Sequence, residues 1–237
     1  NIDPLIKLVE IQYLINEGPK VYINKIDING NDRTLDNVIR RELKIVEGDA
    51  YSKYSVDSSK NSILALGFFD EVNVSETKTK DKDKINIDID VSEKNTGEAS
   101  IGAGYSSTTK ANLQLGLKEK NFLGKGQMLK FNSNFGQDVT TYDISFAEPY
   151  FNGRNLYTRA DVYSQFEDYG SVNYETEKLG LAASLGFPMS YDKRITLNYS
   201  IYTDTTKADA NATKYEQLLA GTSTISSIGH KFVSDKR

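Results

Sequence analysis

The stretch ANLQLGLK, residues 111 to 118, alternates apolar and polar side chains without a break. One face of an extended strand with this sequence holds only apolar side chains, namely Ala111, Leu113, Leu115 and Leu117. Side chains of a strand point alternately to its two faces, so this strand has one face for an apolar environment and one for water. The same period of two recurs through the rest of the chain, which predicts a sheet of similar strands.

We expect eight such strands, separated by Gly, Asn, Asp and Pro, near residues 98–105, 110–119, 127–136, 140–148, 155–167, 175–187, 193–203 and 224–235. In the central, membrane-length part of the first seven, the apolar face carries no charged residue. A lysine or arginine that faces lipid at mid-depth costs about 2–4 kcal/mol. The opposite face keeps charged side chains, including Lys130, Asp143 and Arg159. The pattern therefore predicts antiparallel transmembrane β-barrel strands around a wide, polar interior.

Composition excludes several classes of protein. The 237 residues carry a net charge of −4, which disfavours nucleic acid as a partner. There is no cysteine and one histidine, His230, so we predict no disulfide, no metal site, no cofactor and no enzyme active site. No apolar run is long enough for a transmembrane helix, and a mean hydropathy of −0.51 cannot detect alternating strands.

Residues 21–94 have the pattern of a separate small α+β domain. Alternation predicts strands at 21–28, 69–76 and 84–93. Between the first two, a helix is expected in residues 34–44 and a second near 55–66. The first helix is predicted from Leu35, Val38, Ile39 and Leu43, which recur at the spacing of one helical face. The predicted order is strand, helix, helix, strand, strand, between the end of a preceding domain (residues 1–20) and the barrel part (95–237).

The segment KNFLGKGQ, residues 120 to 127, superficially resembles a phosphate-binding loop because a lysine stands between two glycines. Such a loop needs a longer glycine-rich run, ending in Gly-Lys-Ser or Gly-Lys-Thr, between a strand and a helix. Here Gln127 follows the second glycine and strands are expected on both sides. We therefore predict a tight hairpin turn, with Gly124 and Gly126 supplying backbone freedom and Lys125 in water.

Aromatic side chains gather at the turns of one predicted rim: Phe122, Tyr150, Phe151, Phe187 and Tyr191. The other rim includes the long, polar connection of residues 204–223. Short turns with an aromatic belt are typical of the periplasmic rim of outer-membrane barrels. Because the first strand must begin on the short-turn side, the domain before it is expected in the periplasm.

Linked motifs carry a family resemblance over nearly the whole chain. The segments KIDINGNDRT (25–34), VIRRELKIVEGDAY (38–51) and LALGFFDEVNV (64–74) lead through SEKNTG (92–97) into IGAGYSS (101–107). This order resembles the last POTRA domain and first barrel strands of the BamA family of outer-membrane protein assembly factors. NFLGKGQ and EPYFNGRN are similar to the first two periplasmic turns of that barrel, and SIGHKF to its eighth strand.

The resemblance implies a non-enzymatic assembly protein that folds unfolded outer-membrane proteins into the lipid of the outer membrane. Clients are expected to add a strand to the sheet edge around Val72 and Val74. Glu42, with its neighbour Arg41, would dock a periplasmic lipoprotein, although a solvated glutamate paired with an arginine is the simpler alternative. The resemblance also implies a weakly paired lateral seam that includes Ile101, Gly102 and Gly104. The alternative is that the strand glycines only make room for neighbouring side chains.

About eight of the sixteen or so strands that the resemblance implies are present. A POTRA-barrel relative that exports polypeptide, such as a two-partner secretion transporter or a translocation-assembly protein, remains the alternative. A diffusion porin is a third hypothesis, which conductance without any effect on client folding would favour.

Overall fold

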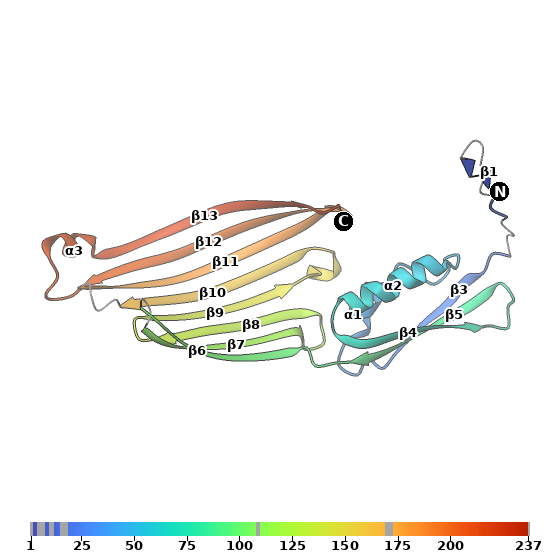
Figure 1. The fold of residues 1–237 in the computed structure, drawn as a ribbon, viewed down its shortest axis with the longest axis horizontal. Helices are drawn as coiled ribbons and strands as arrows, with labels where there is room; N and C mark the ends of the chain where they lie inside the picture. The colour runs from blue at the N-terminus through green and yellow to red at the C-terminus, as the bar shows by residue number, and fades with distance from the viewer. Residues whose placement is uncertain are drawn as a thin grey trace.

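The computed structural model describes residues 2–3, 8–9, 12–14, 19–107, 110–168 and 173–236. Two short strands, β1 (Ile2–Asp3) and β2 (Leu8–Val9), pair with each other. Most of residues 1–20, the predicted end of a preceding domain, lies outside the described residues. The remainder forms a small α+β domain and a long, curved sheet that lie end to end (Figure 1).

The α+β domain has a three-stranded sheet in the order β3-β5-β4, covered on one face by two helices (Figure 1). Its elements are β3 (Tyr22–Asn29), α1 (Asp36–Arg40), α2 (Lys53–Ala65), β4 (Phe69–Lys78) and β5 (Lys84–Glu93). β5 runs parallel to β3 and antiparallel to β4. The predicted order of elements is confirmed.

The apolar side chains of the strands and of the two helices pack into one core. Every second residue of β5, from Ile87 to Val91, points at the helices, while Asp88 and Asp90 point to solvent. Helix α1 contributes Val38 and Ile39, and α2 contributes Val56 and Ile63. Leu35 was predicted to point inward but is 46% exposed. The reason is that α1 begins only at Asp36, so Leu35 precedes the helix and lies outside its apolar face.

The second unit is an eight-stranded antiparallel sheet in which each strand pairs with its sequence neighbours. Its strands are β6 (Gly97–Ser106), β7 (Lys110–Phe122), β8 (Gln127–Gly136), β9 (Val139–Glu148), β10 (Tyr157–Asp168), β11 (Tyr174–Ser190), β12 (Lys193–Ala208) and β13 (Gly221–Ser234). β6 and β13 form the two edges, and in the described residues they do not pair, so the barrel is partial.

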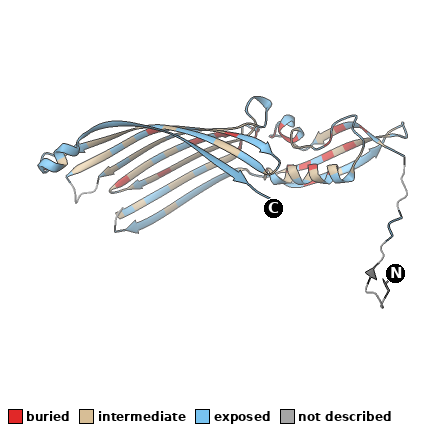
Figure 2. Ribbon diagram, turned by 90° about the horizontal axis from the view of Figure 1, so that it is seen from above, coloured by how far each residue is buried: buried red, intermediate tan, exposed pale blue. Residues whose placement is uncertain are grey.

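The register confirms the predicted two faces. Leu117 lies opposite Ala99 on one side and Phe131 on the other, and Ile144 continues the same apolar row. Many apolar side chains of this face are exposed, Leu117 and Leu181 to 55%, and the strands at the two edges of the sheet are largely exposed in Figure 2. Exposed apolar rows of this kind suit lipid rather than water.

Two features of the loops differ from expectation. The connection after β12 contains a short helix, α3 (Lys214–Leu219), whose capping box is formed by Thr213 and Glu216. Six residues are too few for helical spacing to be detected in the sequence. Longer loops were expected at the rim that holds this connection. That expectation depends on this connection, because the turn between β8 and β9 at the same rim has only two residues, 137–138.

Candidate functional site

In the described residues, the three-stranded sheet is open along the whole of its β4 edge. The outer edge of β3 is occupied over residues 21–26. Gly48 N donates to Ile23 O at 2.7 Å and Tyr51 N donates to Val21 O at 2.8 Å, and the side chains of Glu47 and Arg40 bond the backbone of Ile26. Among the described residues β4 pairs only with β5. An unpaired strand edge presents backbone donors and acceptors to an added strand.

The side chains predicted at this edge are not themselves free. Val72 is only 2% exposed, and Val74 packs against the same core. Any ligand at this edge would therefore meet backbone groups and the solvent-facing side chains of β4, such as Asn73.

Strand β6 is the second candidate edge. Ile101 points to the apolar, outer face and is 77% exposed, whereas Gly102 and Gly104 point to the polar interior. A Cβ on Gly102 would lie 3.8 Å from Gln114 Oε1, which is an ordinary contact. One on Gly104 would lie 3.3 Å from Asn112 Oδ1, which is tight. Space alone therefore gives a reason for glycine at 104 but not at 102.

The turn of residues 123–126, between β7 and β8, docks on the loop that precedes α1. Leu35 N donates to Gly124 O at 2.9 Å. Asn121 Nδ2 donates to Thr34 Oγ1 at 2.8 Å, and both side chains are buried. The turn predicted in KNFLGKGQ is confirmed, and its contact with the α+β domain is an addition that the sequence did not indicate.

Both glycines of this turn have a left-handed backbone and a close neighbour. Gly124 has φ +71°, and a Cβ there would lie 1.9 Å from the Arg33 carbonyl oxygen. Gly126 has φ +69°, and a Cβ would lie 2.5 Å from a guanidinium nitrogen of Arg41. The turn therefore needs glycine both for its conformation and for its approach to the domain.

Glu93, the last residue of β5, fastens the loop on which the turn docks. Its carboxylate accepts hydrogen bonds from Arg33 N at 2.9 Å and Thr34 N at 2.7 Å. Burial opposes ionisation, but the hydrogen bonds from Thr34 and Arg33 prevail and hold the pKa of Glu93 below its usual value. The charged form of Glu93 thus stabilises this loop.

Arg41 and Glu42 also face the sheet. The Arg41 guanidinium lies 4.2 Å from the centre of the Tyr150 ring, and its Nε is 3.8 Å from Glu42 Oε1. The two charged side chains are only 18% and 14% exposed. Burial and the Glu42 carboxylate raise the pKa of Tyr150, while Arg41 acts in the opposite direction. The ion pair between Glu42 and Arg41 is therefore present, but it is largely buried rather than solvated. Docking of a lipoprotein at Glu42 remains a prediction.

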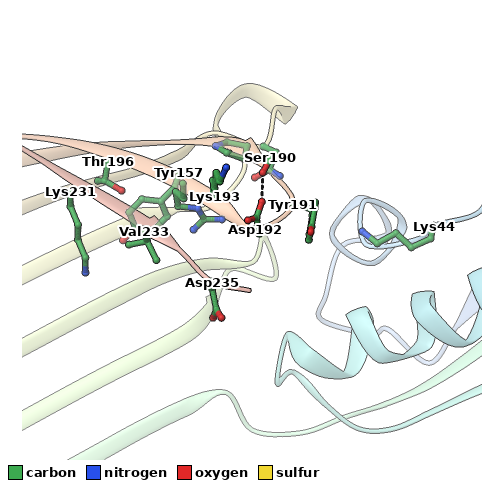
Figure 3. Close-up of a pocket in the computed structure, with 13 residues that line it drawn as sticks. Lys44, Tyr157, Ser190, Tyr191, Asp192, Lys193, Thr196, Lys231, Val233 and Asp235 are labelled. Atoms are coloured by element: carbon green, nitrogen blue, oxygen red, sulfur yellow. Dashed lines mark hydrogen bonds between the residues drawn. The ribbon is translucent and has the colours of Figure 1, made fainter. Parts of the chain in front are cut away.

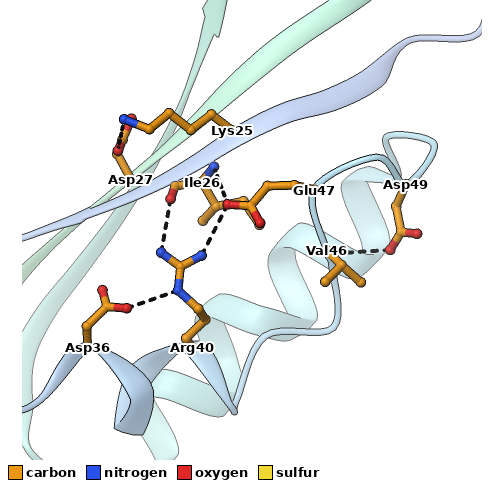
Figure 4. Close-up of polar contacts among 8 residues, drawn as sticks. All are labelled: Lys25, Ile26, Asp27, Asp36, Arg40, Val46, Glu47 and Asp49. Carbon is orange, nitrogen blue, oxygen red and sulfur yellow. Dashed lines mark hydrogen bonds and ion pairs between the residues drawn. The ribbon is translucent and has the colours of Figure 1, made fainter.

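The neighbouring Arg40 has a purely structural environment (Figure 4). Its guanidinium donates to Asp36 Oδ2 at 3.0 Å, to Glu47 Oε1 at 3.2 Å and to the Ile26 carbonyl at 3.2 Å. These bonds fix α1 to β3. The two arginines of the IRREL segment therefore have different roles: Arg40 makes contacts within the α+β domain, and Arg41 contacts Tyr150 of the sheet. The sequence alone does not distinguish them.

The five aromatic residues predicted for one rim all lie at the end of the sheet that faces the α+β domain. Phe122 ends β7, Phe187 lies near the end of β11, and Tyr191 is fully exposed in the turn before β12. Phe151 is half exposed in the 3-10 turn η1 (Phe151–Gly153). Tyr150 instead packs under Arg41. A membrane-anchoring role for this belt stays a prediction.

A cavity of about 690 Å³, lined by both charged and apolar side chains, opens at the same end of the sheet (Figure 3). Lys44 of the α+β domain lines it together with Arg194, Lys193 and Lys231 of the last two strands, and Ser190 hydrogen-bonds Asp192 beside them. Inward-facing residues of β12 and β13, such as Thr196 and its cross-strand partner Lys231, form part of its wall.

Within the described ranges, no helix has the length and apolar character needed to cross a membrane. The same ranges contain no cluster of three or more His, Cys, Asp or Glu side chains arranged to hold a metal ion.

Comparison with protein-family models identifies both units. Residues 21–94 match the POTRA model, described as a surface antigen variable number repeat. Residues 121–237 match the Omp85 superfamily domain. The first match corresponds to the α+β domain, and the second covers the sheet from the end of β7 onward.

Curated relatives carry the name outer membrane protein assembly factor BamA. The relative from Neorickettsia risticii is 28% identical over 230 residues, which are 96% of this chain and 31% of that protein. The relative from Neisseria meningitidis serogroup B is 28% identical over 194 residues, 79% of this chain and 24% of that protein. The chain thus spans less than a third of these relatives.

A solved structure has the same fold. The crystal structure of BamA from Haemophilus ducreyi lacking POTRA domains 1–3 matches with a TM-score of 0.75 at 24% identity. The match covers 98% of this chain and 47% of that one. The barrel strands accordingly belong to the bacterial outer membrane, with the POTRA domain in the periplasm. The chain is a homologue of the BamA assembly factors, with a POTRA domain at residues 21–94 followed by an Omp85 superfamily domain at residues 121–237.

Proposed function

We propose that this chain is the part of a non-enzymatic assembly factor that receives unfolded outer-membrane proteins and passes them into the lipid bilayer. The POTRA domain would bind client segments along the open edge of β4, and β6 would serve as the template at a lateral seam. The observation that carries the proposal is that a domain with an open β4 edge is joined directly to an edge strand of the barrel. Both edges offer backbone pairing to an extended client.

The assembly reaction can be tested with the full-length protein in liposomes. An unfolded outer-membrane client is added, and its insertion is followed by resistance to protease. The proposal predicts faster insertion than in empty liposomes. Ion conductance without faster insertion would favour a porin, and transport of the client into the liposome lumen would favour a secretion transporter.

The β4 edge has its own test, which uses the absence of cysteine from these 237 residues. Asn73 of β4 and Asp90 of β5 lie opposite each other and face solvent. A client strand added to β4 would lie about 5 Å from Asn73 but about 10 Å from Asp90, because neighbouring strands are spaced by roughly 4.8 Å. A client peptide with one cysteine should therefore form a disulfide with Asn73→Cys and not with Asp90→Cys. Equal cross-linking at both positions would contradict strand addition at this edge.

A lipoprotein partner that binds Glu42 would have to compete with contacts inside the chain. The Glu42 carboxylate lies beside Arg41 and Tyr150 in the described structure. We therefore expect Tyr150→Phe, which removes the hydroxyl, to strengthen lipoprotein binding and Glu42→Gln to weaken it. Unchanged affinity in both variants, measured by co-purification and titration, would exclude docking at Glu42.

A further inference from the structure

Asn121 is the centre of the contact between the POTRA domain and the first barrel hairpin, which we define as β6 and β7. Its side-chain Nδ2 donates to Thr34 Oγ1 in the POTRA domain at 2.8 Å. Its Oδ1 accepts from Gly126 N in the following turn at 2.7 Å. Asn121 and Thr34 are 9% and 2% exposed. One buried amide therefore holds the turn and the domain together.

Further hydrogen bonds close a ring around the connector of residues 94–96. Glu119 accepts from Asn121 N at 2.7 Å and also from the Thr96 hydroxyl in the connector. On the other side, Thr34 is held by Glu93, the residue immediately before the connector. The connector is thus bridged by bonds that run from the end of β5, through Thr34 and Asn121, to the end of β7.

The contact with the next periplasmic turn is of a different kind. There Arg41 lies over the ring of Tyr150, and its buried Nε has no hydrogen-bond partner in the described structure. An arginine over an aromatic ring tolerates sliding and rotation better than a directional hydrogen bond does. Breaking the Asn121–Thr34 bond, in contrast, leaves a buried donor unpaired, which is costly.

We infer that Asn121 is a positioning residue that fixes the POTRA domain to the first hairpin, so that the domain, β6 and β7 move as one body. Rotation of the domain then separates it from Tyr150 first and carries the edge strand β6 with it. The coupling is a property of the protein without any client, so it stands or falls separately from the proposed function.

Distances between paired spin labels test the coupling in the full-length protein in liposomes, without client. One label replaces the exposed Asn61 on α2, and its partner replaces either Lys125 in the first turn or Tyr191 in the third. We expect a narrow distance distribution for the Asn61–Lys125 pair and a broader one for Asn61–Tyr191. Asn121→Ala and, should that variant not fold, Thr34→Val should widen the Asn61–Lys125 distribution at least twofold.

Two controls separate coupling from general destabilisation. Asn29→Ala removes a side-chain amide bond of 3.2 Å to Asp90 inside the POTRA domain and should leave the Asn61–Lys125 distribution narrow. Arg41 contacts Tyr150 and also lies close to Gly126 of the first turn, so Arg41→Ala should widen the Asn61–Tyr191 distribution more than the Asn61–Lys125 distribution. A wild-type Asn61–Lys125 distribution as broad as that of Asn61–Tyr191, or one that Asn121→Ala and Thr34→Val leave unchanged, would overturn the inference.

Discussion

At the scale of single residues, the junction depends on side chains far apart in the sequence. Asn121 and Thr34 are separated by 87 positions, and neither residue type by itself indicates a buried contact. The glycines of KNFLGKGQ could be assigned to a turn because glycine is favoured at positive φ. Their second task, the close approach to Arg33 and Arg41, could not be predicted, because it depends on how two separate folding units meet.

Gly124→Ala should open the junction. Alanine at positive φ costs about 1–2 kcal/mol, and here its Cβ would also lie 1.9 Å from the Arg33 carbonyl oxygen. We expect trypsin to cleave several-fold faster after the exposed Lys94, in the connector. Gly153→Ala is the matched control, since Gly153 has the same φ of +71° but no atom within 4 Å of the added Cβ. Equal cleavage in both variants would show that the close approach is unimportant.

Glu93 should make the stability of the POTRA domain depend on pH in the acid range. The pKa of Glu93 is lowered in the folded state by its hydrogen bonds from Thr34 and Arg33. Its contribution is therefore fully present above the pKa of an unfolded glutamate, about 4.3, and is lost as pH falls through the lowered folded value. Urea unfolding of wild type and Glu93→Gln should differ at pH 7 and converge toward pH 3. A difference that is constant with pH would contradict this assignment.

At the scale of elements, strands were the easiest features to predict, because alternation over ten or more residues leaves little freedom of register. The predicted strand at 127–136 has the observed bounds of β8, and Leu113 and Leu117 lie on the predicted face. Helices were harder. The expected helix of residues 34–44 is reduced to Asp36–Arg40. Thr34 and Leu35, before it, contact the first turn, and the chain after Arg40 continues as a turn, in which Glu42 N donates to Ile39 O at 3.0 Å. Open edges follow from topology, which alternation alone does not specify.

Strand β6 should tolerate Gly102→Ala structurally but lose activity. The added methyl group meets only an ordinary contact at 3.8 Å, so folding should be unaffected. Glycine weakens a strand interior, and alanine should make β6 less easily loosened. We expect slower client insertion with an unchanged thermal transition. Gly229→Ala in β13 is the control, because a Cβ there meets no atom within 4 Å. Equal insertion rates in Gly102→Ala and wild type would remove the argument that Gly102 loosens the seam.

For the whole molecule, the proposed function requires that β6 pairs with client strands during insertion. Ala103 of β6 and Leu113 of β7 are cross-strand neighbours on the same outer face. A client strand paired with β6 would lie about 5 Å from Ala103 but about 10 Å from Leu113, given a strand spacing of roughly 4.8 Å.

The most direct measurement is disulfide trapping of a client with one cysteine in a terminal strand, during insertion by the full-length protein in liposomes. We predict that Ala103→Cys captures the client while it inserts and that Leu113→Cys does not. Insertion at the normal rate without capture at Ala103→Cys, or with equal capture at both positions, would contradict the account.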